Sequence, residues 1–171
     1  MGRKPLILGA QMINTDITAT DANSYAREDD LTSFATSRGI DLPEKLEPLL
    51  IRAMDYLEGL DWIGVKANPR QPLAWPRVNV VLDGHDLPHD ELPRQVITAQ
   101  CMLAIEAIEG DLLSSVREAA VKTERVEGAV TMTYAVADGE VFTPSYPAVM
   151  AILGELAGGR GYAINSFAER A

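Results

Sequence analysis

Apolar residues recur at three- and four-residue steps along several stretches of the chain, which is the pattern of helices with one buried face. The first stretch spans about residues 27–38 and is followed by Gly39. The second begins near Pro43 or Pro48 and stops at Gly59. Proline is tolerated in the first helical turn and glycine is favoured just past the last one. Both stretches are therefore predicted to be amphipathic helices.

A third stretch, PRQVITAQCMLAIEAIEG, predicts a longer helix from Pro93 to Glu109, with Gly110 directly after it. Its polar residues fall on one narrow stripe and apolar residues cover most of the remainder; the polar positions are Gln95, Thr98, Glu106 and Glu109. A helix this apolar has to be covered on several sides. We expect it to be the central member of a helical bundle or the wall between packed subunits.

The pattern changes to strand-like alternation in VKTERVEGAVTMTYAV, which predicts a β-hairpin near residues 121–136. A last helix is predicted from Pro147 to Leu156, and the glycines that follow begin an extended C-terminal arm over residues 158–171. The predicted fold class is mainly α: a small bundle of about four helices with a β-hairpin and this arm. Residues 1–157 are expected to form the domain.

The charge and cysteine content exclude several classes of protein. Net charge is −10, from 25 acidic against 15 basic side chains, which argues against a general binder of the phosphate backbone. Cys101 is the only cysteine, so neither an intramolecular disulfide nor a cysteine-based zinc site is possible. No apolar run is long enough for a membrane span, and we expect a protein made in the cytoplasm with no membrane partner.

The pairs His85-Asp86 and His89-Asp90 are the strongest candidates for chemistry, because they supply nitrogen and carboxylate ligands for a metal ion. However, Asp83-Gly84 is a strong turn signal, and Pro88 prevents a helix that would stack the two histidines. The pairs are therefore interpreted as turn and connector residues, and Cys101 as a small buried side chain. We predict no catalytic residue, metal site or cofactor, and no enzymatic activity.

The segment 62–82 stands out because it holds three cations, Lys66, Arg70 and Arg77, and no acid. In its middle, Trp75 lies directly before Pro76. Either Trp75 plugs the bundle from a loop, or it anchors a subunit interface, where Trp and Arg are over-represented. The residues predicted to form interfaces are these four and three from the arm: Lys66, Arg70, Trp75, Arg77, Tyr162, Ile164 and Phe167. A basic loop followed by an acidic stretch also suits head-to-tail contact between identical subunits.

Several motifs in order along the chain resemble a family of small tailed-phage neck proteins that carry the label DnaT-like single-stranded DNA-binding protein. The matching stretches are DANSYA at 21–26, RAMDYLEG at 52–59, QPLAWPR at 71–77, LPRQVITAQCMLA at 92–104, GDLL at 110–113, VKTERVEGAVTMTY at 121–134 and YPAVMAIL at 146–153. As a set they span most of the chain.

This resemblance implies a structural head-to-tail adaptor of a tailed bacteriophage. Such an adaptor forms an oligomeric ring, a dodecamer by resemblance, beneath the portal protein and joins it to the next neck or tail-completion protein. Double-stranded DNA passes through the lumen during viral genome packaging without being specifically bound. The expected location is the neck of the virion, between head and tail.

The alternative is a single-stranded DNA-binding, DnaT-like accessory module of replication. In that case Lys66, Arg70 and Arg77 would contact phosphates in a salt-sensitive way, and bases would stack on Trp75 or Trp62. The two hypotheses use the same loop and differ in what it touches.

Overall fold

The computed structural model describes residues 13–113 and 146–157. Four helices lie in these ranges, namely α1 (Glu28–Thr36), α2 (Glu47–Glu58), α3 (Arg94–Glu109) and α4 (Pro147–Leu153), and the short 3-10 helix η1 (Gly154–Leu156) continues α4. Four two-residue strands pair as β1 (Val65–Lys66) with β2 (Arg77–Val78), and β3 (Val81–Leu82) with β4 (His85–Asp86), both antiparallel. The described part is mainly helical, as predicted. The hairpin predicted near 121–136 and the arm at 158–171 lie outside the described residues.

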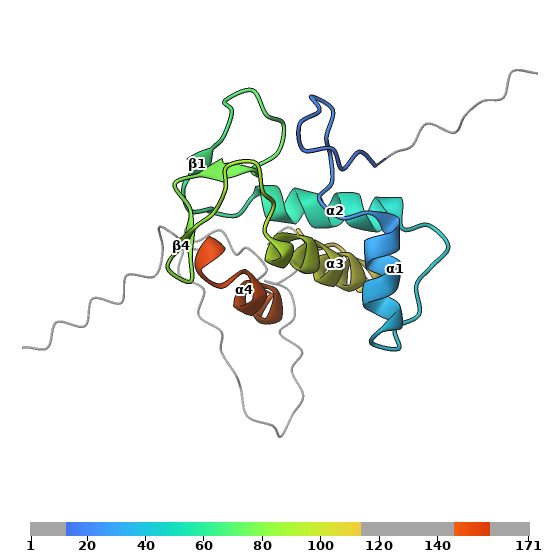
Figure 1. Cartoon of the computed structure of the whole chain (residues 1–171). Helices are drawn as coiled ribbons and strands as arrows, with labels where there is room; N and C mark the ends of the chain where they lie inside the picture. Colours follow the sequence, from blue (N-terminus) through green and yellow to red (C-terminus); the bar gives the residue numbers. More distant parts are fainter. Residues whose placement is uncertain (1–12, 114–145, 158–171) are drawn as a thin grey trace, which may run out of the picture.

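Helix α3 is the central element of the bundle. It packs against α2, α4 and α1, and its Val96, Ala99, Leu103 and Ala107 are almost completely buried. Figure 1 shows α2 and α3 along the middle of the molecule, with α1 at one end and the strands and their loops at the other. The prediction that this helix lies at the centre of a bundle is confirmed.

The helix boundaries follow the signals in the sequence. Helix α1 begins with Glu28, Asp29 and Asp30, whose charges favour the positive end of a helix dipole, and the Asp30 carboxylate accepts a hydrogen bond from the backbone N–H of Arg27 at 2.8 Å. Helix α2 carries Pro48 in its first turn, and Gly59 follows its last residue.

A buried amide joins the segment before α1 to the centre of the bundle. Gln100 of α3 is fully buried, and its Oε1 accepts hydrogen bonds from the backbone N–H groups of Tyr25 at 2.9 Å and Ala26 at 2.7 Å. Its Nε2 donates to Ser24 Oγ at 2.7 Å and to the carbonyl of Leu50 in α2 at 3.1 Å. All four hydrogen bonds of the amide are made. We call Gln100 with these four partners the Gln100 junction.

The first His-Asp pair lies in the hairpin formed by β3 and β4. Asp83 and Gly84 have φ angles of 51° and 79°, which is the left-handed conformation that a two-residue hairpin turn requires. His85 and Asp86 are exposed, but they form strand β4 directly after the turn and not the turn itself, which corrects their predicted place. In residues 13–113 and 146–157, no three His, Cys, Asp or Glu side chains gather as a metal ion would need.

Cys101 lies beside the Gln100 junction and is only 2% exposed. Burial, with a smaller contribution from Asp30, raises the pKa of its thiol to about 12. The thiol therefore keeps its proton near neutral pH. It is not expected to act as a nucleophile, because only the thiolate is one. The prediction of a small buried residue is confirmed. No helix in the described part of the chain has the length and apolar character needed to cross a membrane.

Candidate nucleic-acid interface

The loop that joins β1 to β2 holds its shape through its own amide groups. The backbone N–H of Ala67 donates to the carbonyl of Pro76 at 3.1 Å, where the loop closes. Gln71 Nε2 donates to the carbonyls of Leu73 and Pro76, both at 2.9 Å, while its Oε1 accepts from the backbone N–H of Asn68 at 2.9 Å. The loop therefore presents its outward side chains from a defined backbone.

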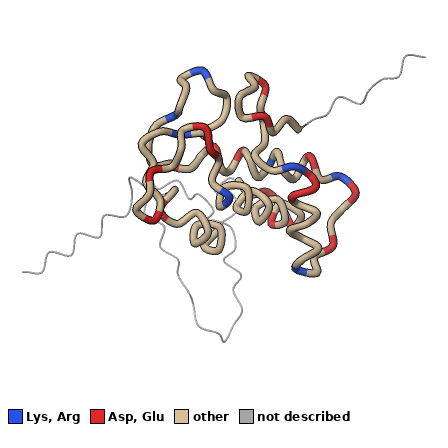
Figure 2. Tube along the Cα trace, in the orientation of Figure 1, with Lys and Arg blue, Asp and Glu red and all other residues tan. Residues whose placement is uncertain are grey.

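Two of the three cations of this region lie at the surface, Lys66 on β1 and Arg70 on the loop that follows it. Lys66 and Arg70 are exposed, and neither side chain makes a hydrogen bond or ion pair with another described residue. Figure 2 shows basic positions and no acidic one on the loop that rises beside β1. The segment 62–82 contains no Asp or Glu, so the loop itself carries only positive charge although the net charge of the protein is −10.

Arg77 is used differently, as part of the scaffold. Its half-buried guanidinium donates to the backbone carbonyls of Ile63 (2.6 Å), Trp62 (3.3 Å), Gly64 (2.9 Å) and Ala74 (3.0 Å). Four of its five N–H donors are thereby occupied. Desolvation lowers the pKa of the group, opposed by nearby Tyr25 and Glu58. We call this set of contacts the Arg77 clamp. It leaves one N–H donor of Arg77 for a phosphate.

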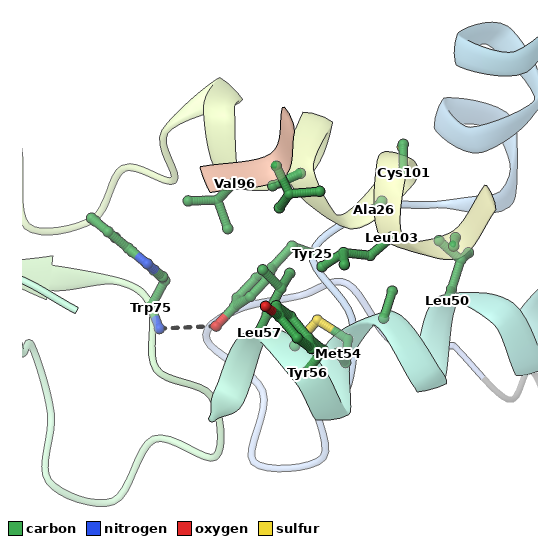
Figure 3. Close-up of a cluster of buried hydrophobic side chains, with 14 of the residues drawn as sticks. Tyr25, Ala26, Leu50, Met54, Tyr56, Leu57, Trp75, Val96, Cys101 and Leu103 are labelled. Atoms are coloured by element: carbon green, nitrogen blue, oxygen red, sulfur yellow. Dashed lines mark hydrogen bonds between the residues drawn. The ribbon is translucent and has the colours of Figure 1, made fainter. Parts of the chain in front are cut away.

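Trp75 fills the core from the loop. Its side chain is fully buried, and its ring meets that of Trp62 edge to face, with centroids 5.6 Å apart and an interplanar angle of 85°. Figure 3 shows its backbone nitrogen joined to the hydroxyl of Tyr25, a hydrogen bond of 3.1 Å. Of the two alternatives for Trp75, the plug of the bundle is confirmed, and in this conformation the residue offers no surface to a base or a partner.

Tyr25 and Glu58 fasten the loop to the end of α2. The Tyr25 hydroxyl donates to Glu58 Oε1 at 2.7 Å, and the backbone N–H of Ala74 donates to the same oxygen at 3.0 Å. Burial and then the charge of Glu58 raise the pKa of Tyr25, so that the hydroxyl keeps its proton and stays a donor. No spacing in the sequence indicates this contact, because it joins residues 33 and 16 positions apart.

Trp62 is the aromatic residue that remains accessible next to the cations. It is half-buried, and its Nε1 donates to the carbonyl of Leu57 at 3.0 Å, which fixes the orientation of the ring. Its backbone pairs with Ala157. With Glu58, Asp61, Val65 and Lys66 it lines a groove of about 630 Å³, which we call the Trp62 groove.

The structure thus separates the residues that the sequence placed together. Lys66 lines the Trp62 groove, and Arg70 is exposed on the β1–β2 loop. Trp75 is enclosed in the core, and Arg77, which also lines the groove, is held by its four backbone carbonyls. Tyr162, Ile164 and Phe167 lie outside the described residues, and their predicted interface role stays a prediction. Glu58 and Asp61 were missed, since a single acid near the end of a helix carries no distinctive signal.

Comparison with known proteins gives one match. The model of a family described as "Putative DnaT-like ssDNA binding protein" matches residues 10–171. Neither the curated proteins nor the solved structures include a match to the chain.

The matched family is described by single-stranded DNA binding and not as a phage connector, so the adaptor hypothesis is wrong, as are the virion, neck and portal-binding functions that it implied. The net charge of the protein gave the DNA-binding alternative too little weight, because DNA contact needs only a local cluster of cations. The expected ring, the portal and tail partners and the location remain untested predictions. Since the match covers nearly the whole sequence, the chain belongs to the family of DnaT-like ssDNA-binding proteins.

Proposed function

We propose that the protein binds single-stranded DNA on the face formed by the β1–β2 loop and the Trp62 groove. The observation that carries this proposal is that Lys66 on β1 and Arg70 on the β1–β2 loop are exposed and their side chains have no partner among the described residues. The backbone of this loop is fixed by the hydrogen bonds of Gln71. Membership of a family described by this activity supports it.

The chemistry of this face suits single strands. Lys66 and Arg70 can neutralise phosphates and release counterions, while the half-buried ring of Trp62 and the 55% exposed Val65 offer apolar surface to unstacked bases. Because Trp62 is already oriented by its bond to Leu57, little entropy is lost when a base packs on it. With two phosphate contacts, the logarithm of affinity is expected to fall against the logarithm of salt with a slope of about −1.4.

The opposite end of the molecule does not suit DNA. A larger hollow of about 860 Å³ lies beside the start of α1, and its lining includes Asp16, Asp21, Glu28, Asp29 and Glu47 against the single cation Arg27. This concentration of carboxylates repels phosphate, so the approach of a strand is directed to the β1–β2 loop.

The test is binding of a fluorescently labelled thymidine oligomer, followed by anisotropy at low ionic strength. The double variant Lys66→Glu/Arg70→Glu is expected to weaken binding at least about tenfold. The matched control is Lys45→Glu/Arg38→Glu, which changes the net charge equally at two exposed positions near α1 and the start of α2. The control is expected to weaken binding by less than about threefold, through long-range repulsion alone.

Equal losses in the two double variants would contradict the assignment of the site to this loop. Absence of binding by the unaltered protein at low salt would contradict the proposed function itself. Circular dichroism of each variant separates loss of binding from loss of fold.

A further inference from the structure

The Trp62 groove is lined both by groups that attract a DNA strand and by groups that repel it. Lys66 and the guanidinium of Arg77 line the groove and attract phosphate, yet the carboxylates of Glu58 and Asp61 line the same groove. Acids beside a DNA site reduce affinity for the backbone, so their presence calls for contact with another part of the nucleotide. This inference rests on the proposed function and concerns which bases the site accepts.

We propose that the Trp62 groove takes up one unstacked base and selects guanine through the carboxylates of Asp61 and Glu58. Asp61 is exposed, and no described residue donates a hydrogen bond to it. In Glu58 both hydrogen bonds go to Oε1, from the Tyr25 hydroxyl and the Ala74 N–H, which leaves Oε2 without a described donor. Both residues therefore present acceptor oxygens in the groove.

An ionised carboxylate can only accept hydrogen bonds, so the base that suits it is the one with the most donors on one edge. The Watson–Crick edge of guanine carries N1–H and the N2 amino group side by side, which match the two oxygens of a carboxylate. Thymine presents a single N–H between two carbonyl oxygens, and these would face the carboxylate with like partial charge. Cytosine and adenine are expected to bind with intermediate affinity, because the Watson–Crick edge of each carries one amino donor beside an acceptor nitrogen.

The positions of the residues allow one nucleotide to use the whole groove. Lys66 lies on β1, Glu58 ends α2, and Asp61 and Trp62 lie in the connection between them. A phosphate held near Lys66 and a base packed on Trp62 bring the edge of that base toward the end of α2. Glu58 is held in place by two hydrogen bonds, so it is pre-organised for this contact.

The experiment compares thymidine oligomers of about twelve nucleotides that differ only in one central base, within the length range that single-strand binding sites cover. A central guanine is expected to bind about fivefold more tightly than a central thymine, with hypoxanthine, which lacks the N2 amino group, in between. Asp61→Asn is expected to bring the guanine-to-thymine ratio close to one, because the amide replaces one acceptor with a donor. Asp41→Asn, at an exposed position between α1 and α2, removes the same charge and is expected to keep the ratio.

Equal affinity for guanine and thymine in the unaltered protein would overturn base selection while leaving the proposed DNA binding in place. An unchanged ratio in Asp61→Asn, measured with a folded protein, would overturn the role of the groove. Failure to bind any oligomer would overturn both proposals. Asp61 is exposed and makes no described hydrogen bond, so its replacement is not expected to affect folding.

Discussion

Gln100 and Arg77 each hold an irregular segment in place with four hydrogen bonds, but Gln100 does so at the centre of the bundle and Arg77 at the β1–β2 loop, with different chemistry. Gln100 is neutral and fully buried, and it joins residues 24–26 to α2 and α3. Arg77 is charged and half-buried, and it joins residues 62–64 to Ala74.

The difference in charge and burial between Gln100 and Arg77 reflects their different roles. A neutral amide can be fully buried once its hydrogen bonds are made. Full burial of a charge, in contrast, costs about 3 kcal/mol or more. Arg77 keeps part of its surface in water, and its loop carries Lys66 and Arg70 outward. The Gln100 junction thus stabilises the bundle, and the Arg77 clamp fixes the geometry of a surface that we expect to bind a ligand.

The largest effect is expected at the Gln100 junction. Gln100→Leu keeps the apolar volume but leaves the backbone N–H groups of Tyr25 and Ala26 buried without an acceptor. The free energy of unfolding is expected to fall by about 3–5 kcal/mol, since each such group costs about 1–3 kcal/mol. Urea denaturation followed by circular dichroism measures the change.

Gln95→Leu on the same helix is the control for this variant. Gln95 is only half-buried and its side chain makes no hydrogen bond within the described residues, so its replacement is expected to change stability by less than about 0.5 kcal/mol. If the two variants were equally stable, the Gln100 junction would not be the main fastening of residues 24–26.

The sequence predicted the helices but neither of these two sets of hydrogen bonds. Periodicity and the prolines and glycines predicted α1 to α4 closely, because helix signals are local. Gln100 was hidden inside an apolar run, and Arg77 was taken for a contact residue, because both act through partners distant in the sequence. The roles of Trp62 and Trp75 are likewise decided by packing, which leaves one ring accessible and encloses the other.

A smaller effect is expected from Gly64, one of the residues held in the Arg77 clamp. Gly64 has a φ of +67°, and a Cβ there would lie 2.4 Å from the carbonyl oxygen of Val78. Gly64→Ala is expected to cost about 3 kcal/mol, because strand β1 would have to move away from β2. Gly39→Ala is the matched control, since Gly39 has a φ of +65° with nothing within 4 Å of the added atom.

The control isolates the steric contribution. Gly39→Ala is expected to cost only the backbone strain of about 1 kcal/mol. Thermal unfolding of both variants gives the difference, and equal costs would mean that β1 and β2 can separate without loss of stability.

The smallest effect on stability is expected from Arg77→Lys, which tests whether Arg77 acts as a clamp or as a charge. Lysine keeps the positive charge but cannot direct donors at four carbonyls, so unfolding is expected to become easier by about 1–2 kcal/mol. Affinity for a thymidine oligomer is expected to fall about fivefold, because Lys66 and Arg70 would then project from a less ordered loop. Arg77→Met should weaken binding to the same extent. If Arg77→Lys retained full affinity while Arg77→Met lost it, the charge of Arg77 would be the contributor, and the residue would belong with Lys66 and Arg70 in the DNA-binding surface.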